Sequence, residues 1–353
     1  MGVMRSIFRF LGGVLALTSP EAVALEPVAV WDGLPGLGKK AAVNVSGIVC
    51  GPERDGERVC LVVYDEKRHA RFFALRGNTF TARDEIQLLD HDPGVDRDDE
   101  HEADLEAVAY DSGFAWAFGS HSRKKTGSVE EKAEERPARR RLYRFPVDDL
   151  GRPTFAHREE ERAPQVEVFG DLLDVLAADP LLAPIVADET PVDLGGLNIE
   201  GGTVVAGRMW LGLRAPLHAS GDGDRAHLVG LDAAALFAGR RPPVEVHLLP
   251  LGKGKGIRDL APAGPRAEDG LLVLAGSALP DDGRTRPLST LWLWAGPGAM
   301  PVMLAELAVA DRDAKPEAVT VLDATPTGWR VLVLMDGVKG GRPTEYLVPR
   351  PTP

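Results

Sequence analysis

Four acidic residues recur in similar short segments of this chain, and carboxylates in such a set can bind a metal ion. Each lies beside apolar residues, and the four are Glu106, Glu200, Asp259 and Glu317. Carboxylates that converge on one place repel one another, and a hard cation with oxygen ligands relieves that repulsion. We therefore predict that they bind a metal, calcium first. The same carboxylates could instead accept hydrogen bonds from backbone amides of neighbouring segments, or pair with Arg258 or Arg214.

Cationic and hydroxyl side chains accompany the acidic segments and predict recognition of a small polar or anionic molecule. Guanidinium groups bind carboxylate or phosphate groups through paired hydrogen bonds. The predicted ligand-binding residues are Ser120, Arg123, Arg214, Arg258, Lys315 and Asp336. Salt bridges to the glutamates explain the arginines equally well.

His121 is the candidate catalytic residue, because an imidazole can act as a general acid or base together with a distant carboxylate. It lies between Ser120 and Ser122. A serine nucleophile activated by this histidine is disfavoured, because adjacent residues on an extended chain point to opposite sides.

The acidic segments belong to a repeat that predicts the fold. Each copy continues through a turn into a hydrophobic, strand-like run, and a degenerate first copy has Ser46 in place of the acid. Positions 46, 106, 200, 259 and 317 are separated by 60, 94, 59 and 58 residues. A period of this size built from strands favours the blades of a β-propeller. With 39 Gly and 28 Pro, the chain also suits a turn-rich, all-β fold. We predict a single propeller of five blades and leave a sixth open.

The long step of 94 residues contains two insertions. Residues 124–140 are a charged, solvated loop, and residues 171–185 have the apolar spacing of one or two short helices. A sixth blade could also lie within this step. Strand-like runs at Val28–Trp31 and Glu345–Val348 predict that one blade is completed from both ends of the chain, which removes an exposed sheet edge.

A propeller would bring the polar residues of the repeat to one mouth of its central channel. The start of each first strand and the end of its antiparallel second strand lie on the same side, and first strands surround the channel. The predicted rim therefore combines an opening set of Ser46, Glu106, Glu200, Arg258, Asp259, Lys315 and Glu317 with a closing set of Asp65, Ser120, His121, Ser122, Arg123, Arg214, Ser277 and Asp336.

The N-terminus predicts export. Arg5 and Arg9 precede the apolar stretch FLGGVLAL, and Ala22-Val23-Ala24 supplies the small residues of a cleavage site. We predict a signal peptide at residues 1–24, a propeller domain at residues 25–353, and a periplasmic or secreted protein. No segment is long and apolar enough to predict membrane insertion.

Charge and cysteine content narrow the partners and the chemistry. The formal net charge of −12 disfavours nucleic acid and anionic lipid surfaces as partners. Cys50 and Cys60 lie at the base of a predicted hairpin, where opposed strand positions can form a disulfide. The alternative is two buried thiols. No oligomeric interface can be read from the sequence.

Several strings together resemble a bacterial family known only as a domain of unknown function. They are ADLEAVAYD, GSHSRKK, GGLNIEG, WLGLRAPL, GIRDLAP, KPEAVTV and LMDG, and the likeness runs from about Val45 to Asp336. That family is similar to a broader group of propellers with phytase-like and esterase-like members. The resemblance implies a propeller, and phytase-like relatives suggest calcium and phosphate esters only by analogy of fold. This chain departs from the pattern where Arg258-Asp259 replaces a glutamate.

The leading functional hypothesis is an exported propeller that binds a small polar or anionic ligand at the channel mouth, with calcium as the candidate cofactor. A rival hypothesis is a metal-dependent hydrolase of phosphate or carboxylic esters, in which His121 would transfer the proton. A third is a scaffold for protein interactions with an inert rim.

Overall fold

The computed structural model describes residues 24–38, 41, 43–65, 68–90, 102–123, 137–158, 161–279, 288–309, 311 and 313–351. The predicted signal peptide, apart from Ala24, and residues 124–136 of the predicted charged loop lie outside the described residues. None of the helices in the described ranges is long and apolar enough to cross a membrane.

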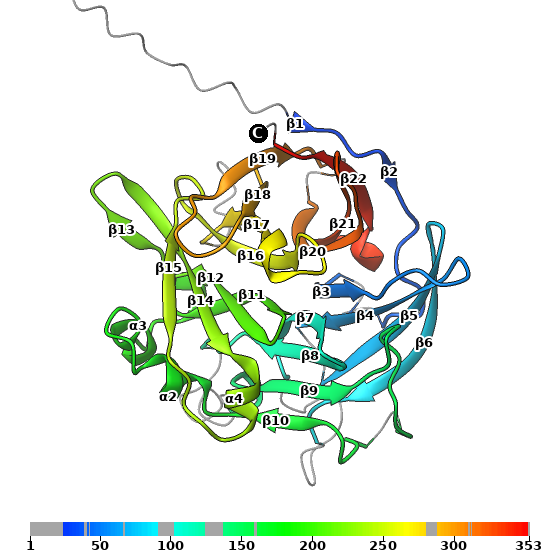
Figure 1. The fold of residues 1–353 in the computed structure, drawn as a ribbon, viewed down its shortest axis with the longest axis horizontal. Helices are drawn as coiled ribbons and strands as arrows, with labels where there is room; N and C mark the ends of the chain where they lie inside the picture. The colour runs from blue at the N-terminus through cyan, green and yellow to red at the C-terminus, as the bar shows by residue number, and fades with distance from the viewer. Residues whose placement is uncertain are drawn as a thin grey trace, which may run out of the picture.

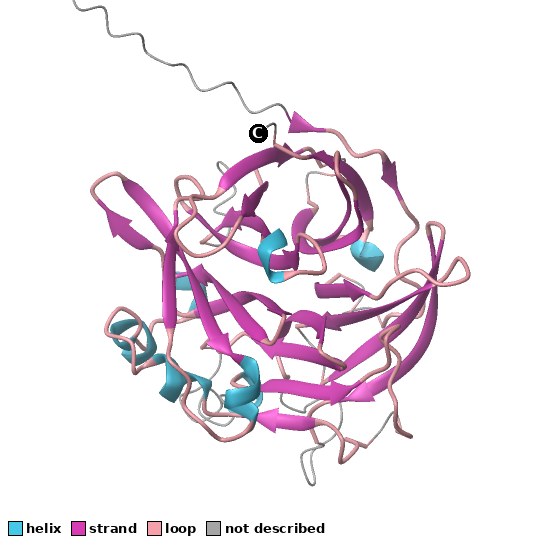
Figure 2. Ribbon diagram, viewed as in Figure 1, coloured by secondary structure: helices cyan, strands magenta, loops and turns pink. Residues whose placement is uncertain are grey.

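Five antiparallel sheets are arranged around a common centre, as Figure 1 shows. Strands dominate and helices are few and short (Figure 2). The fold is therefore a five-bladed β-propeller, and both the predicted fold class and the smaller of the two blade numbers are confirmed.

The blades are numbered here in chain order. Blade 1 contains β3 (Val45–Cys50), β4 (Arg58–Tyr64), β5 (His69–Arg76) and β6 (Thr79–Gln87). Blade 2 contains β7 (Leu105–Asp111), β8 (Phe114–Gly119), β9 (Leu142–Pro146) and β10 (Glu167–Phe169). Blade 3 contains β11 (Asn198–Val205), β12 (Arg208–Ala215), β13 (His218–Ser220), β14 (Gly223–Asp232) and β15 (Glu245–Leu249).

The last two blades include strands from the start of the chain. Blade 4 contains β16 (Lys255–Pro262), β17 (Leu271–Ser277), β18 (Thr290–Trp294) and β19 (Val302–Leu307), with β1 (Ala24–Leu25) added in parallel to β19. Blade 5 contains β20 (Lys315–Ala324), β21 (Gly328–Asp336) and β22 (Thr344–Pro349), and β2 (Ala29–Val30) pairs with β22. The predicted closure of one blade by both ends of the chain is confirmed.

The innermost strands form a closed ring, in which β3, β7, β11, β16 and β20 each contact the next and β20 contacts β3. Five hydrophobic clusters fill the wedges between neighbouring blades. A sheet packed on both faces is buried along nearly its whole length, as in β17, where only Ser277 is not fully buried. This two-sided burial explains why the hydrophobic runs do not alternate cleanly with polar residues.

Short helices lie in the connections between strands. The insertion predicted at residues 171–185 forms α2 (Leu172–Leu176) and α3 (Ala183–Ala187). Leu172 and Leu176 of α2 join the cluster between blades 2 and 3, and Ile185 of α3 packs against it. Among the described residues, helical turns also occur at residues 137–139, in α4 (Ala233–Phe237) and in the 3₁₀ turns η1 (Val192–Leu194), η2 (Ala267–Asp269) and η3 (Lys339–Gly341). The helical insertion is thereby confirmed.

The two cysteines are joined. Cys50 on β3 and Cys60 on β4 occupy directly opposed positions, with their Cα atoms 4.0 Å apart, and form a disulfide. The bridge lies within one hairpin of blade 1, as predicted.

Candidate functional site

Each innermost strand carries one extra residue near its start, at the second, third or fourth position of the strand. In blade 1, Val45 and Gly47 pair with the consecutive residues Tyr64 and Val63, so Ser46 has no partner position on β4. The same β-bulge in the other four blades leaves out Glu106, Glu200, Arg258 and Glu317. A bulge locally turns the strand and redirects the extra side chain. All five bulged residues line one cavity.

The residue after each bulge lies where neighbouring inner strands approach closely. A Cβ on Gly47 would stand 2.9 Å from Cα of Ala107, and one on Gly201 would stand 2.7 Å from Cγ2 of Ile257. Real Cβ atoms are not found this close to other heavy atoms, so only glycine fits at these two positions without movement of a neighbour. In most blades the bulged residue therefore follows an apolar residue and precedes a small one.

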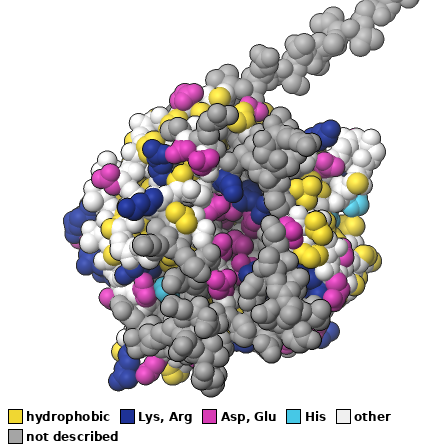
Figure 3. Space-filling view, turned by 180° about the vertical axis from the view of Figure 1, so that it is seen from behind, with side chains coloured by type: hydrophobic (Ala, Val, Ile, Leu, Met, Phe, Trp, Pro, Cys, Tyr) yellow, Lys and Arg dark blue, Asp and Glu magenta, His cyan; other side chains and the backbone are white. Residues whose placement is uncertain are grey.

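The cavity has a volume of about 420 Å³ and lies at the mouth of the channel. Figure 3 views this face, with Asp and Glu side chains gathered at its centre and Lys and Arg beside them. Seven carboxylates line the cavity, namely Asp65, Asp104, Glu106, Asp193, Glu200, Glu317 and Asp336. Four cations also line it, namely Arg139, Arg214, Arg258 and Lys315. The described lining therefore carries more acids than bases.

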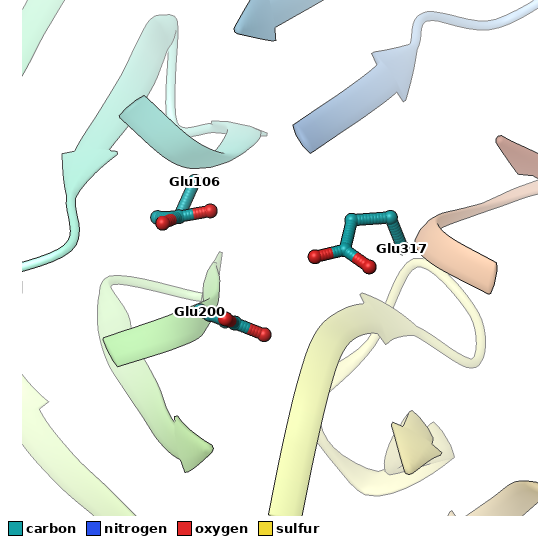
Figure 4. A group of neighbouring side chains, drawn as sticks. All are labelled: Glu106, Glu200 and Glu317. Carbon is teal, nitrogen blue, oxygen red and sulfur yellow. The ribbon is translucent and has the colours of Figure 1, made fainter. Parts of the chain in front are cut away.

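Three of the four predicted metal-binding acids converge in this cavity. Glu106 from β7, Glu200 from β11 and Glu317 from β20 each offer one carboxylate oxygen, and the three oxygens lie within 4.8 Å of one another. Figure 4 shows the three carboxylates facing the same space. Glu200 is 3% exposed and Glu317 is 8% exposed. Side chains more than 90 residues apart in sequence are thus brought together by the bulges.

The protonation of these glutamates reflects burial and mutual repulsion. Burial, reinforced by Asp104 and Glu200, raises the pKa of Glu106 well above its ordinary value. Burial also raises the pKa of Glu317 to about 7, although Arg258 opposes that rise. The site therefore gains stability from any positive charge, proton or cation, that enters it.

Two arginines already compensate part of the negative charge. Arg258 lies between two glutamates, with Nε 3.1 Å from Oε2 of Glu200 and its Nη2 paired with Glu317. Nη1 of Arg214 donates to Oε1 of Glu200 at 2.8 Å, and its Nε donates to the carbonyl of Ser277. Burial alone would lower the pKa of Arg258, but the neighbouring glutamates raise it. The pairing of glutamates with Arg258 and Arg214 was the alternative that the sequence left open.

Glu106 differs from the other two glutamates. Within the described residues its carboxylate has neither a hydrogen bond nor an ion pair. The guanidinium of Arg258 pairs with Glu200 and Glu317, whereas Glu106 acts on it only through its charge.

Asn198 adds a second unsatisfied oxygen. Its Nδ2 donates to Oε1 of Glu200 at 2.8 Å, and the side chain lines the cavity with 3% exposure. Its Oδ1 is buried and accepts no hydrogen bond from the described residues. Buried polar atoms are usually paired, so an acceptor of this kind indicates a missing donor or cation.

A polar network lies beside Glu106. One carboxylate oxygen of Asp104 accepts hydrogen bonds from Ser120, from Ser122 at 3.1 Å and from Arg139 at 2.5 Å. Ser120 is fully buried in this network and does not line the cavity, whereas Ser122 does. The network fixes the entry to β7 and holds Asp104 with its charge compensated.

Asp259 is placed differently from the other predicted metal ligands. The strand register puts Arg258, not Asp259, at the bulged position of blade 4. Asp259 does not line the cavity, and its two oxygens accept hydrogen bonds from the amides of Leu260 and of Val319 in the next blade. This is the backbone-accepting role that the sequence offered as an alternative.

His121 and Arg123 also lie off the cavity lining. His121 is 1% exposed, its Nδ1 lies 2.7 Å from the carbonyl of Gly119, and burial lowers its pKa to about 4. Arg123 pairs with Glu189 at 2.8 Å. The remaining predicted ligand residues, Lys315 and Asp336, do line the cavity and form a loose pair at 3.7 Å.

Asp104, Asn198 and Arg139 are cavity residues that the sequence analysis did not select. Asp104 and Asn198 each stand two positions before a bulged glutamate, a place that is also polar in blade 5, where it holds Lys315. That shared offset was a usable signal. Arg139 lies within residues 124–140, which the sequence predicts as a solvated loop. The prediction is wrong at this residue, because Arg139 is buried and pairs with Asp104.

Residues 53–346 match the family described as "Protein of unknown function (DUF3616)". The chain belongs to this family. The sequence resemblance to a propeller family of unknown function is thereby confirmed. A search of curated proteins finds no match.

The solved structures that this chain resembles are remote in sequence. Glutaminyl cyclase from Myxococcus xanthus is 8% identical, with a TM-score of 0.41 over 92% of this chain and 97% of that one. An exo-β-1,3-galactanase from Clostridium thermocellum is 9% identical, with a TM-score of 0.45 over 92% and 62%. A family 117 glycoside hydrolase from Zobellia galactanivorans is 11% identical, with a TM-score of 0.42 over 91% and 87%. Likenesses this remote carry no information about activity.

Proposed function

We propose that this DUF3616 propeller binds a small polar ligand at the bulge-lined mouth of its channel, and that Glu106, Glu200 and Glu317 hold a divalent cation there. The observation that carries the proposal is the convergence of three carboxylate oxygens from three blades within 4.8 Å. Calcium is the first candidate, because it is a hard cation that takes carboxylate and amide oxygens as ligands.

The unsatisfied groups around the convergence support a cation. Glu106 has no cationic partner among the described residues, and Oδ1 of Asn198 is buried without a donor. Asn198 would supply a neutral fourth oxygen, as side-chain amides do in calcium sites. A cation would also relieve the repulsion that raises the pKa of Glu106 and Glu317.

The arginines of the site are already paired, and this limits how an anionic ligand could bind. Arg214 and Arg258 are occupied by glutamates, and Arg123 pairs outside the cavity, so these three are poor receptors for an anion. An anionic ligand would instead be held by the cation, with the exposed amine of Lys315 as a second contact. We therefore assign the ligand a metal-coordinating oxygen group.

Hydrolysis of phosphate or carboxylic esters is the second candidate function. It is favoured by the pKa of about 7 at Glu317, since a carboxyl group that titrates near neutrality can exchange a proton with a substrate. The proton would then be carried by whichever of the glutamates does not bind the cation, because His121 is held against Gly119 outside the cavity lining. The cation would supply charge stabilisation for the reacting oxygen.

The test begins with thermal unfolding of purified protein in chelator, with calcium and with magnesium. A ligand at 100 times its dissociation constant adds about 2.7 kcal/mol of stability, which raises the unfolding temperature by about 4 °C for a protein of this size. We expect a shift of that order with calcium and its loss in Glu106→Gln. The matched control is Glu268→Gln, an exposed glutamate paired only with Arg266 near it.

A screen of generic phosphate and carboxylic esters follows with the calcium-loaded protein. A calcium shift without turnover supports the binding function, and a shift with turnover that Glu317→Gln abolishes supports the hydrolase. If calcium and magnesium leave the unfolding temperature unchanged, the cation site is wrong and the mouth of the channel is an inert rim.

We also propose that the protein is exported. The Cys50–Cys60 disulfide supports this, because disulfides persist in oxidising compartments, and so does the signal-like sequence of residues 1–24. N-terminal sequencing of the protein from its native cells should begin at Leu25 if the signal is cleaved after Ala24. A retained N-terminus in the cytoplasmic fraction would contradict export.

A further inference from the structure

One side of the cavity mouth is apolar, unlike the rest of its rim. Three large aliphatic side chains stand there in water, Leu194 at 71% exposure, Leu279 at 53% and Leu288 at 50%. Leu279 itself lines the cavity, and Leu194 and Leu288 are next in sequence to the lining residues Asp193 and Ser289. We call these three leucines the ledge. The charged residues Asp65, Lys315 and Asp336 also line the cavity.

The ledge is built from two segments that lie against each other. Leu194 ends η1 before blade 3, and Leu279 follows β17 of blade 4. A Cβ on Gly195 would stand only 3.1 Å from Cδ2 of Leu279, so the two segments are in contact distance. Figure 3 shows hydrophobic side chains beside the acidic centre of this face.

The ledge is also tied to the charged part of the cavity. The hydroxyl of Ser277 donates to the carbonyl of Leu279 at 2.8 Å, and the carbonyl of Ser277 accepts from Nε of Arg214 at 3.2 Å. Arg214 in turn pairs with Glu200. The apolar and acidic surfaces are therefore one continuous site, and exposed apolar surface at the edge of a polar cavity is typical of a ligand groove.

We infer that the ligand is a small amphipathic molecule, with an oxygen-rich head in the glutamate cavity and an aliphatic portion that lies on Leu194, Leu279 and Leu288. This inference rests on the proposed function for the binding of the oxygen-rich head. It adds that the rest of the ligand is an aliphatic chain. Such a tail gains free energy by removing ledge and ligand surface from water, and the acidic cavity alone would reject it. The chain's negative charge disfavours an anionic membrane as the source of that tail.

The test uses a series of straight-chain carboxylates from acetate to octanoate, titrated into the protein by calorimetry in calcium and again in chelator. Full burial of one methylene contributes about 0.8 kcal/mol, which is a factor of about four in affinity. We expect affinity to rise about two- to fourfold for each added methylene across the middle of the series. In the double variant Leu194→Ser/Leu279→Ser, the gain in binding free energy per added methylene should be less than half of the wild-type gain.

The matched control is Leu347→Ser, which removes an equally exposed leucine, at 54%, from the outer strand β22. It should keep the wild-type dependence on chain length. All the substituted leucines are exposed, so the variants should fold, and their unfolding temperatures check this.

The inference is overturned if affinity does not change with chain length, if no member of the series binds, or if the double variant keeps the wild-type dependence. It is also overturned if the double variant only abolishes a dimer in sedimentation, because a second copy of the chain would then cover the ledge. Failure of the proposed function looks different: calcium does not bind, while the dependence on chain length persists in chelator.

Discussion

The negative charge of the glutamate cluster is compensated by arginines on one side and not on the other. On the side of blades 3 to 5, Arg258 joins Glu200 to Glu317 and Arg214 adds a second bond to Glu200. On the side of blade 2, Glu106 faces them without a cation among the described residues, beside an Asp104 that Arg139 already satisfies. The repeat therefore fixes where the bulged side chain lies and not which charge it carries. Four bulges hold charged residues, three of them acidic and one basic. Once Arg214 is counted with Arg258, one carboxylate remains without an ion pair among the described residues.

The largest effect is expected from Arg258→Ala. It leaves two buried carboxylates facing each other, and breaking a buried pair of this kind costs about 3–5 kcal/mol of unfolding free energy. Urea unfolding in chelator measures the loss, and calcium should restore part of it by replacing the lost charge. Arg266→Ala, at an exposed pair, serves as the control and should change little. If Arg258→Ala loses no more unfolding free energy than this control, Glu200 and Glu317 do not depend on Arg258, and the two sides of the cluster are alike.

Asp259→Asn should come next and should act on stability alone. The aspartate accepts two backbone hydrogen bonds between blades 4 and 5, and an amide nitrogen cannot accept the second, at a cost of about 1.5–3 kcal/mol. Calcium affinity, measured by titration, should stay within about twofold of the wild type. A tenfold loss of calcium affinity would mean that Asp259 is a ligand of the metal.

The dependence of stability on pH gives a smaller effect. The folded pKa of Glu317, about 7, lies above its ordinary 4.5, so the native state holds more protons than the unfolded state between these values. Its stabilising contribution is complete below pH 4.5 and is lost as pH rises through 7, by on the order of 2 kcal/mol.

The measurement is the unfolding free energy of the wild type minus that of Glu317→Gln, in chelator, from pH 4.5 to 8. Subtraction removes other titrating groups, including buried His121, whose lowered pKa acts in the opposite direction. We expect the difference to fall as pH rises. A difference that rises with pH would mean that Arg258 dominates burial at Glu317.

The smallest effect is expected on the uncompensated side. Glu106→Gln removes a carboxylate without a described partner, so at pH 9 in chelator it should stabilise the protein by about 1 kcal/mol rather than destabilise it. Thermal unfolding against Glu268→Gln measures the change. Destabilisation would show that Glu106 already has a favourable contact and that the two sides are alike.

Much of the fold was predictable, because it depends on a repeat that survives in the sequence. The spacing of the acidic segments gives the blades, the runs at Val28–Trp31 and Glu345–Val348 give the closure, and the opposed Cys50 and Cys60 give the disulfide. The helical insertion follows from its apolar spacing. Each of these is a local or periodic pattern.

The site was only partly predictable, because its geometry depends on strand register. Alignment by residue type puts Asp259 beside the glutamates, whereas alignment by the apolar, bulged and small positions puts Arg258 there. Sequence also cannot tell which arginine meets which glutamate, since these pairs join different blades. The network of Asp104 with Arg139 and the unsatisfied oxygen of Asn198 likewise appear only once the chain is folded.

The central claim is that one cation binds between Glu106, Glu200 and Glu317. Anomalous diffraction from crystals grown with calcium, or with manganese as a stronger scatterer, tests it most directly. We expect a single peak between β7, β11 and β20, within about 2.6 Å of oxygens of these glutamates, and no such peak in Glu106→Gln. A cavity without a peak at saturating metal, or a peak that stays in that variant, would contradict it.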